Sequence, residues 1–156
     1  MATIRLPPDF KEFLKLLKEY DVRYLLIGAY AVNYHGYIRA TGDMDLWVAI
    51  HPDNARKMVT VLRAFGFEND PNIKPELFLR EKKIIRMGVP PLRLEISTSI
   101  SGVEFDECFK SRIVDKLDGV EVNLIDLENL KKNKKASGRP KDITDFKKLQ
   151  QKKRRA

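Results

Sequence analysis

The amino-acid sequence predicts an α+β protein in which a mixed β-sheet is backed by helices. Segments with apolar residues at helical spacing, such as residues 9–20, are separated by short runs of branched or alternating residues that are typical of strands. Turn residues mark the boundaries between these segments, and no internal repeat or linker interrupts them. A chain of 156 residues is long enough to bury a core of its own. We therefore expect a single domain over residues 1–156.

Composition narrows the class of protein further. Hydrophobic residues make up 43% of the chain and charged residues 33%, which favours a folded globular protein over a disordered one. The longest apolar segment, residues 24–32, is far shorter than the roughly 20 residues of a membrane helix. Residues 1–8 lack the features of a signal peptide, so we expect a cytoplasmic protein with no membrane partner. Cys108 is the only cysteine, which excludes an intramolecular disulfide and favours a small buried side chain there.

The first two elements prepare a phosphate-binding turn. Residues 9–20 place Phe10, Phe13, Leu14 and Leu17 on one helical face, which predicts a helix packed on the core. Residues 24–27 form a short apolar run ended by Gly28, which predicts a buried strand that stops at a tight turn. Residues 29–34 then suit a short helix. Backbone N–H groups between a strand and a helix start suit phosphate binding.

A second strand carries two carboxylates. Residues 43–48 alternate polar and apolar, so Asp43 and Asp45 project as neighbours from the face opposite the apolar residues. Two adjacent carboxylates repel each other unless a cation or a proton lies between them. Hard divalent cations prefer such oxygen ligands. The alternative is an acidic surface turn, which is common for an isolated Asp-x-Asp.

The middle of the chain supplies a third carboxylate. Residues 52–65 predict an amphipathic helix, and a hairpin follows with strands over residues 83–87 and 92–97. Glu95 lies on the second of these strands, where its apolar neighbours face away from it. If this strand lies beside residues 43–48, Glu95 shares the open face with Asp43 and Asp45. Otherwise it is a solvated surface carboxylate.

The last third of the chain predicts a second hairpin and two helices. The hairpin pairs residues 112–116 with 120–124 through an Asp-Gly turn. Asp126 is expected to cap a helix over residues 127–136, and Asp142 to cap the last helix. The buried edge of that last helix is expected to consist of Ile143, Phe146 and Leu149.

The net charge of +8 comes from the C-terminal part of the chain. Residues 1–130 carry 18 Lys/Arg against 20 Asp/Glu, a balance of −2, whereas residues 131–156 carry 12 against 2, a balance of +10. This basic C-terminal helix and tail would attract phosphate polyanions such as RNA through a salt-sensitive term. A solvated basic helix face is the alternative, and the sequence does not separate the two.

Two sequence patterns carry a family resemblance. Residues 28–45 read Gly-x-x-Ala-x-x-x-His-Gly-x-x-Arg-x-Thr-x-Asp-x-Asp, and residues 135–145 read Lys-x-x-Gly-Arg-x-Lys-Asp-x-x-Asp. The first resembles the signature of the nucleotidyltransferase superfamily of the DNA polymerase beta type. Both look like small bacterial and archaeal nucleotidyltransferase-like proteins that are linked to toxin–antitoxin or phage-defence systems. The resemblance implies a nucleotidyltransferase-like fold.

The resemblance also implies roles for particular residues. Metal binding and catalysis would fall to Asp43, Asp45 and Glu95, which would hold two Mg²⁺ or Mn²⁺ ions about 3.5–4 Å apart. Nucleotide binding would fall to Gly28, Ala29, Arg39, Thr41, Lys135, Arg139 and Lys141. Ala29 departs from the Gly or Ser of the signature, which removes a hydroxyl but leaves the backbone N–H.

Three functions follow as alternatives. The first is a metal-dependent transferase that moves a nucleoside monophosphate from a nucleoside triphosphate to an RNA end, a protein side chain or a small molecule. The second is a catalytically inactive module that binds a nucleotide or a partner, including a cognate toxin or antitoxin. The third is an RNA-binding protein led by its basic tail. His35 and Arg39 have ordinary structural alternatives too, as a helix-terminal packing residue and as a partner for an acidic side chain.

Overall fold

A six-stranded mixed sheet forms the centre of the protein. The computed structural model describes residues 4–38, 40–89 and 92–151. The strands are β1 (Tyr24–Ile27), β2 (Asp43–Val48), β3 (Ile84–Val89), β4 (Leu92–Ser97), β5 (Ile113–Leu117) and β6 (Val120–Leu124). They lie in the order β3-β4-β2-β1-β6-β5, so β1 and β2 are central. The pairs β1–β6 and β2–β4 are parallel and the other three are antiparallel. The predicted α+β class and mixed sheet are confirmed.

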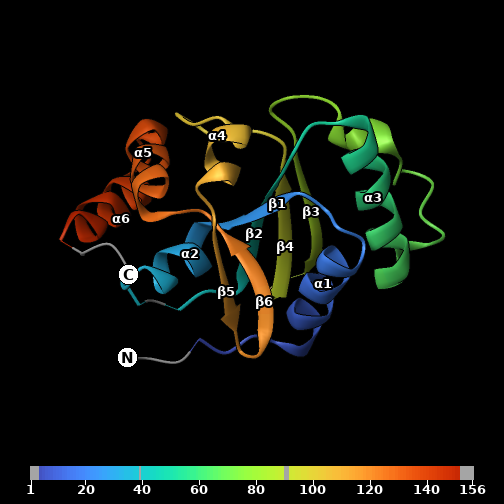
Figure 1. The fold of residues 1–156 in the computed structure, drawn as a ribbon, viewed down its shortest axis with the longest axis horizontal. Coiled ribbons are helices and arrows are strands. Elements are labelled where there is room, and N and C mark those ends of the chain that lie inside the picture. Colours follow the sequence, from blue (N-terminus) through green and yellow to red (C-terminus); the bar gives the residue numbers. More distant parts are fainter. Residues whose placement is uncertain (1–3, 39, 90–91, 152–156) are drawn as a thin grey trace.

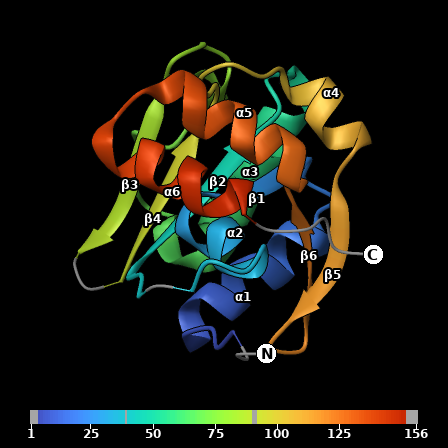
Figure 2. The same cartoon turned by 90° about the vertical axis from the view of Figure 1, so that its left-hand side faces the viewer.

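Helices cover both faces of this sheet (Figure 1). They are α1 (Pro8–Glu19), α2 (Gly28–Tyr34), α3 (Pro52–Leu62), α4 (Phe105–Lys110), α5 (Leu127–Ser137) and α6 (Pro140–Gln150), with a π turn at Arg63–Phe67 and a 3-10 turn at Pro75–Phe78. Helices α1 and α3 lie on one side, and α2, α5 and α6 on the other, where Figure 2 shows α5 and α6 in front of β2 and β4. None of the helices in the described ranges combines the length and the apolar character needed to cross a bilayer.

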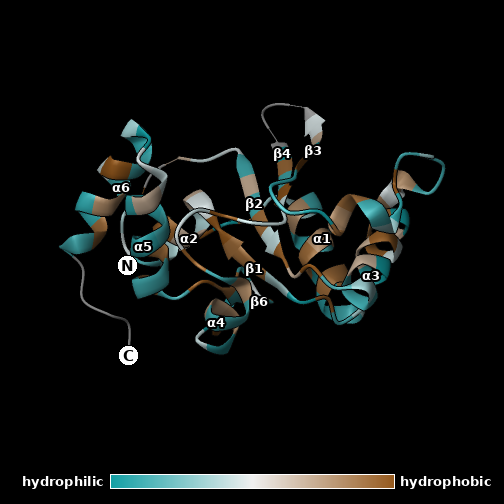
Figure 3. Cartoon of the chain, turned by 90° about the horizontal axis from the view of Figure 1, so that it is seen from above, coloured by the Kyte–Doolittle hydropathy of each residue, from teal (hydrophilic) through white to brown (hydrophobic). Residues whose placement is uncertain are grey.

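The period-two pattern of β2 places its side chains as predicted. Met44, Leu46 and Val48 are fully buried in the main core, whereas Asp43 and Asp45 on the other face remain partly exposed. Figure 3 shows the hydrophobic residues of β1 enclosed between the helices of the two sides. The apolar side chains of the sheet therefore hold β2 in one register, and that register fixes where the two carboxylates emerge.

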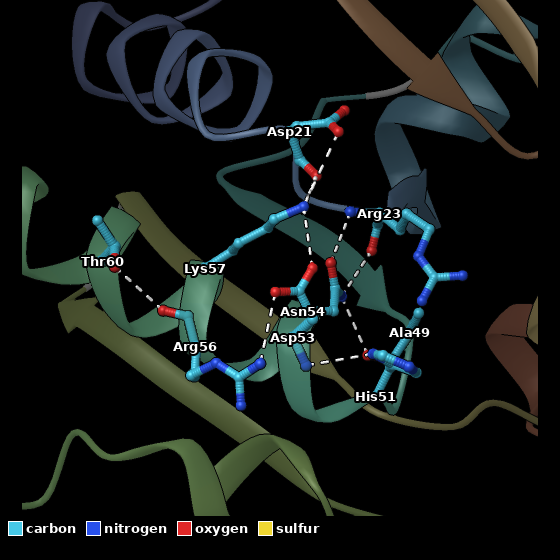
Figure 4. Close-up of polar contacts among 9 residues, drawn as sticks. All are labelled: Asp21, Arg23, Ala49, His51, Asp53, Asn54, Arg56, Lys57 and Thr60. Carbon is cyan, nitrogen blue, oxygen red and sulfur yellow. Dashed lines mark hydrogen bonds and ion pairs between the residues drawn. The ribbon is translucent and has the colours of Figure 1, made fainter.

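A buried asparagine fastens the end of the central strands that lies away from these carboxylates (Figure 4). The Asn54 side chain, at the start of α3, accepts from the backbone N–H of Arg23 at 2.8 Å. It donates to the carbonyls of Arg23 at 3.1 Å and Ala49 at 3.0 Å. Arg23 precedes β1 and Ala49 follows β2, so one side chain satisfies three backbone groups at the point where the β1–β2 pair meets α3.

We expect Asn54→Ala to lower the free energy of unfolding by roughly 2–3 kcal/mol, because it leaves buried backbone groups without partners. Urea denaturation followed by circular dichroism measures the effect. Asn72→Ala, which changes an exposed asparagine in the loop after the π turn, is the matched control and should alter stability by less than about 0.5 kcal/mol. Equal losses in the two variants would contradict this role for Asn54.

The structure corrects two expectations for the last helix. Arg139 stands at the N-cap of α6 without a side-chain cap, and Pro140 begins the helix, so the prediction that Asp142 caps it is wrong. The buried residues of α6 are Asp142, Asp145 and Leu149, so the buried edge predicted from Ile143 and Phe146 is also wrong in part. The physical reason is an ionic contact with α5 that turns the acidic positions inward. By contrast, Asp126 caps α5 as predicted, by accepting from the N–H of Asn129.

Candidate functional site

A row of four residues crosses the sheet and brings two of the predicted carboxylates together. In β1 and β2, Ile27 pairs with Asp45, and in β2 and β4, Asp45 pairs with Glu95. Glu95 in turn pairs with Arg86 of β3. Because directly paired residues project from the same face, Asp45 and Glu95 lie side by side with an apolar neighbour at one end and a cation at the other. The condition on which the placement of Glu95 depended, that β4 lies beside β2, is met.

The Asp45 and Glu95 carboxyl groups of this row share a hydrogen bond, and their pKa values shift in opposite directions. Burial, the hydrogen bond to Glu95 and the charges of Glu95 and Asp43 raise the pKa of Asp45 to about 7. Burial alone would raise the pKa of Glu95, but the hydrogen bonds from Asp45 and Arg86 outweigh it, so this pKa lies below its usual value. Asp45 is therefore the protonated member of the pair.

Gly28 leaves room for the Asp45 carboxylate. The φ angle of Gly28 is 65°, in the left-handed region that disfavours residues with a Cβ. A Cβ at this position would overlap Oδ2 of Asp45 and lie 2.8 Å from its Cβ and Cγ atoms. The absence of a side chain at Gly28 therefore allows the Asp45 carboxylate to lie directly against the turn that ends β1.

We expect Gly28→Ala to lower the free energy of unfolding by more than the roughly 1–2 kcal/mol of a left-handed alanine, because the methyl group also displaces Asp45. Gly119→Ala is the matched control, since Gly119 has a φ of 82° and open space where its Cβ would stand. Thermal denaturation of the two variants separates the backbone cost from the steric cost. Equal losses would show that Asp45 does not constrain position 28.

Two arginines form ion pairs with two of the three carboxylates, Asp43 and Glu95. Arg93 donates from Nη2 to Asp43 at 3.0 Å, and Arg86 donates from Nε to Glu95 at 2.7 Å. Arg93 lies directly opposite Asp43 in the β2–β4 register, as Arg86 lies opposite Glu95. Within the described ranges, no three His, Cys, Asp or Glu side chains are gathered in a geometry ready to hold a metal ion.

The donor chemistry of the site nevertheless fits a hard divalent cation. Asp43, Asp45 and Glu95 offer only carboxylate oxygens, which Mg²⁺ and Mn²⁺ prefer. The raised pKa of Asp45 follows from burial and from the nearby carboxylates, and a bound cation would relieve the repulsion as the proton does. The Arg93 and Arg86 guanidinium groups form ion pairs with Asp43 and Glu95, respectively.

A cavity of about 700 Å³ lies over this row. That volume is within the range of small-molecule sites in proteins, about 300–1,000 Å³. The cavity is lined by most of the residues that the sequence singled out, namely Gly28, Ala29, Thr41, Asp43, Asp45, Glu95, Arg139 and Lys141. Its opposite wall comes from the end of α5 and the start of α6, so the carboxylates and the basic residues face one space.

The remaining sequence-predicted residues have other positions. Arg39 lies outside the described residues. Lys135 does not line the cavity, and its ammonium lies 5.8 Å from the centre of the Phe146 ring. The hydroxyl of Thr41 donates to the backbone carbonyl of Asp43 at 3.0 Å, which steadies the approach to β2. His35 ends α2 as a buried residue with Nε2 at 2.9 Å from the Ile125 carbonyl, in agreement with its structural alternative.

Lys134 replaces Lys135 as the lysine of the cavity wall. Its ammonium lies 2.9 Å from Asp142 and 3.1 Å from Asp145, and the three residues are 6%, 2% and 1% exposed. Asp142 also accepts from the hydroxyl of Ser137 and, at 2.7 Å, from Nε of Arg139. Burial would raise the pKa of Asp142, but these donors outweigh it and hold the pKa at about 2. This buried cluster joins α5 to α6 and sets the position of the basic wall.

The sequence contained signals for the residues that were missed. The buried stripe of α5 consists of Leu127, Leu130 and Lys134, which follow helical spacing. A lysine at a position where the spacing predicts a core residue was therefore the signal for Lys134. Arg86 lies on an alternating strand at a position facing the open side, but only the hairpin register shows that its partner is Glu95. That register depends on the loop, which the sequence did not specify.

Comparisons with known proteins identify the fold. No protein-family model and no curated protein sequence matches the chain. Among solved structures, a Thermotoga maritima protein provisionally named a nucleotidyltransferase aligns with 94% of this chain and 96% of its own, at 13% identity and a TM-score of 0.61. An antigenic nucleotidyltransferase-like protein from Paracoccidioides brasiliensis aligns with 89% of this chain and 72% of its own, at 15% identity and a TM-score of 0.52. The chain therefore has a nucleotidyltransferase-like fold over most of its length.

Proposed function

We propose that the protein is a metal-dependent nucleotidyltransferase. It would transfer a nucleoside monophosphate from a nucleoside triphosphate to a hydroxyl acceptor. The observation that carries this proposal is the in-register pair Asp45 and Glu95, set against Gly28 on one wall of a cavity whose other wall is basic.

The carboxylates would hold the metal. Asp43, Asp45 and Glu95 would bind Mg²⁺ or Mn²⁺, which stabilises the negative charge that develops on phosphate oxygens during transfer. Glu95 also lies where it can accept the proton of an acceptor hydroxyl, because hydrogen bonds keep it the ionised member of the pair. The metal ligands and the base would thus lie on the neighbouring strands β2 and β4.

The walls of the cavity would hold the triphosphate. Arg139 and Lys141 at the start of α6 lie opposite the carboxylates, and Lys134, paired with Asp142 and Asp145, holds this wall in position. The peptide groups at Gly28 and Ala29 line the same space and would contact phosphate without a side-chain hydroxyl. In this arrangement the leaving phosphates would lie toward the wall formed by α5 and α6, and the α-phosphate would lie at the carboxylates, in the cavity that Arg86 also lines.

Transfer of label from α-phosphate tests the proposal. The wild-type protein would be incubated with each of the four nucleoside triphosphates, with Mg²⁺ or Mn²⁺, and with total RNA, a candidate partner protein or small hydroxyl compounds. Metal-dependent label on one acceptor class supports the enzyme and identifies the acceptor. Tight triphosphate binding without transfer to any acceptor would instead favour a catalytically inactive binding module.

A further inference from the structure

Arg86 forms one ion pair among the described residues, and its side chain is exposed. It lies on the edge strand β3, its side chain is 57% exposed, and it lines the cavity. Its Nε donates to Oε1 of Glu95 at 2.7 Å, and neither terminal nitrogen has a hydrogen-bond partner among the residues that the structure describes. A guanidinium held by one nitrogen keeps its other donors available for a second ligand.

Arg93 makes a similar contact in a different setting. Its Nη2 donates to Asp43 at 3.0 Å, while its Nε is buried and has no partner within the described part of the chain. Unlike Arg86, Arg93 is absent from the cavity lining. The two arginines therefore hold two carboxylates of the proposed metal site, but only one of them faces the ligand space.

We infer that Arg86 exchanges partners when the site is loaded, holding Glu95 in the free protein and the triphosphate in the complex. This inference rests on the proposed function. A divalent cation bound to Glu95 repels a guanidinium on the same carboxylate, so the two compete for it. Guanidinium binds phosphate oxygens as well as carboxylates, and Arg86 lines the same cavity in which the triphosphate would bind.

The exchange makes metal binding and nucleotide binding depend on each other. Metal alone must displace Arg86 without giving it a new partner, and triphosphate alone must attract Arg86 away from Glu95. When both ligands are present, the Arg86–Glu95 ion pair is broken only once, and the free energy of breaking it is shared by the two binding events. This is positive coupling between the two sites. Arg93 competes with metal in the same way but gains no phosphate contact.

Mn²⁺ binding, measured by electron paramagnetic resonance with and without a non-hydrolysable triphosphate, tests this inference. In Arg86→Gln we expect the affinity for Mn²⁺ alone to rise by roughly tenfold, and the affinity for Mn²⁺–triphosphate to fall by roughly tenfold, as for the loss of one charge-assisted contact. Arg93→Gln should raise the affinity for Mn²⁺ both alone and with triphosphate, because Arg93 competes for the metal site and does not line the cavity. Arg63→Gln, an exposed position on the π turn, is the control and should change neither affinity.

The outcomes separate this inference from the proposed function. Wild-type Mn²⁺ affinity in Arg86→Gln, in a protein that binds Mn²⁺ with triphosphate, overturns the exchange and leaves the nucleotidyltransferase site intact. A fall in both affinities also overturns it, because Arg86 would then support the site in both states. If neither wild type nor any variant binds Mn²⁺ with triphosphate, the proposed function fails and the exchange fails with it. Because Arg86 is exposed on an edge strand, its variant is expected to fold even if Arg93→Gln does not.

Discussion

Asp45→Asn is expected to lower the rate of nucleotidyl transfer by on the order of 10²–10³ while leaving the fold intact. An amide retains the shape of the side chain but lacks the negative charge that would hold the metal. The metal in turn stabilises negative charge that appears mainly in the transition state. Label transfer from α-phosphate, measured beside the circular dichroism spectrum, checks both parts. Glu19→Gln, an exposed carboxylate of α1, is the control and should transfer at the wild-type rate.

The same variant has an expected effect on stability that depends on pH. The pKa of Asp45 rises from 3.8 to about 7 on folding, so its favourable contribution is complete below pH 3.8 and is lost as pH rises to about 7. The neutral amide avoids this loss and can still donate to Glu95. At pH 8 without metal, Asp45→Asn should therefore raise the free energy of unfolding by roughly 1–3 kcal/mol, and the gain should vanish near pH 4. A variant that is less stable than wild type at pH 8 would contradict the assigned proton.

Lys134→Ala is expected to cost about 3–5 kcal/mol of folding free energy at pH 7, because it leaves Asp142 and Asp145 buried without their ammonium partner. Urea denaturation measures the loss. Lys132→Ala, an exposed lysine on the same helix, is the control and should change stability by less than about 0.5 kcal/mol.

Acid should narrow the difference between Lys134→Ala and wild type. The pKa of Asp142 is lowered from 3.8 to about 2, so its contribution to wild-type stability is present above pH 3.8 and is lost as pH falls toward 2. In the variant the buried carboxylate has lost a principal donor, so protonation relieves it at a higher pH. A stability difference that stays constant from pH 7 to pH 3 would show that the loss comes from packing and not from the ionic cluster.

Local patterns in the sequence predicted the part of the site that depends on single strands. Alternation in residues 43–48 sufficed to place Asp43 and Asp45 on one face, and the same reasoning placed Glu95 on the open face of its strand. The neighbouring position of β2 and β4 required an assumption, since the pairing of strands distant in sequence is decided by tertiary packing. That assumption held, with Asp45 opposite Glu95.

The basic wall was predicted less well because it depends on contacts between helices. The sequence pattern at residues 135–145 indicated Lys135, whereas the rotation of α5 directs Lys134 inward and leaves Lys135 exposed. Aspartate is a residue type that often caps helices, but the Asp142 side chain binds Lys134 and does not cap α6. A buried ionic cluster contradicts the usual rule for polar residues, so hydrophobic periodicity alone misplaces the helix face that carries it.

A crystal structure with Mn²⁺ and a non-hydrolysable nucleoside triphosphate tests the central claim most directly, because it needs no knowledge of the acceptor. We predict anomalous scattering from Mn²⁺ beside Asp45 and Glu95, triphosphate in the cavity that Arg139 lines, and the Arg86 guanidinium on a phosphate instead of on Glu95. Triphosphate bound at another surface of well-folded protein, with no Mn²⁺ at these carboxylates, would contradict the assignment of the cavity as a nucleotidyl-transfer site.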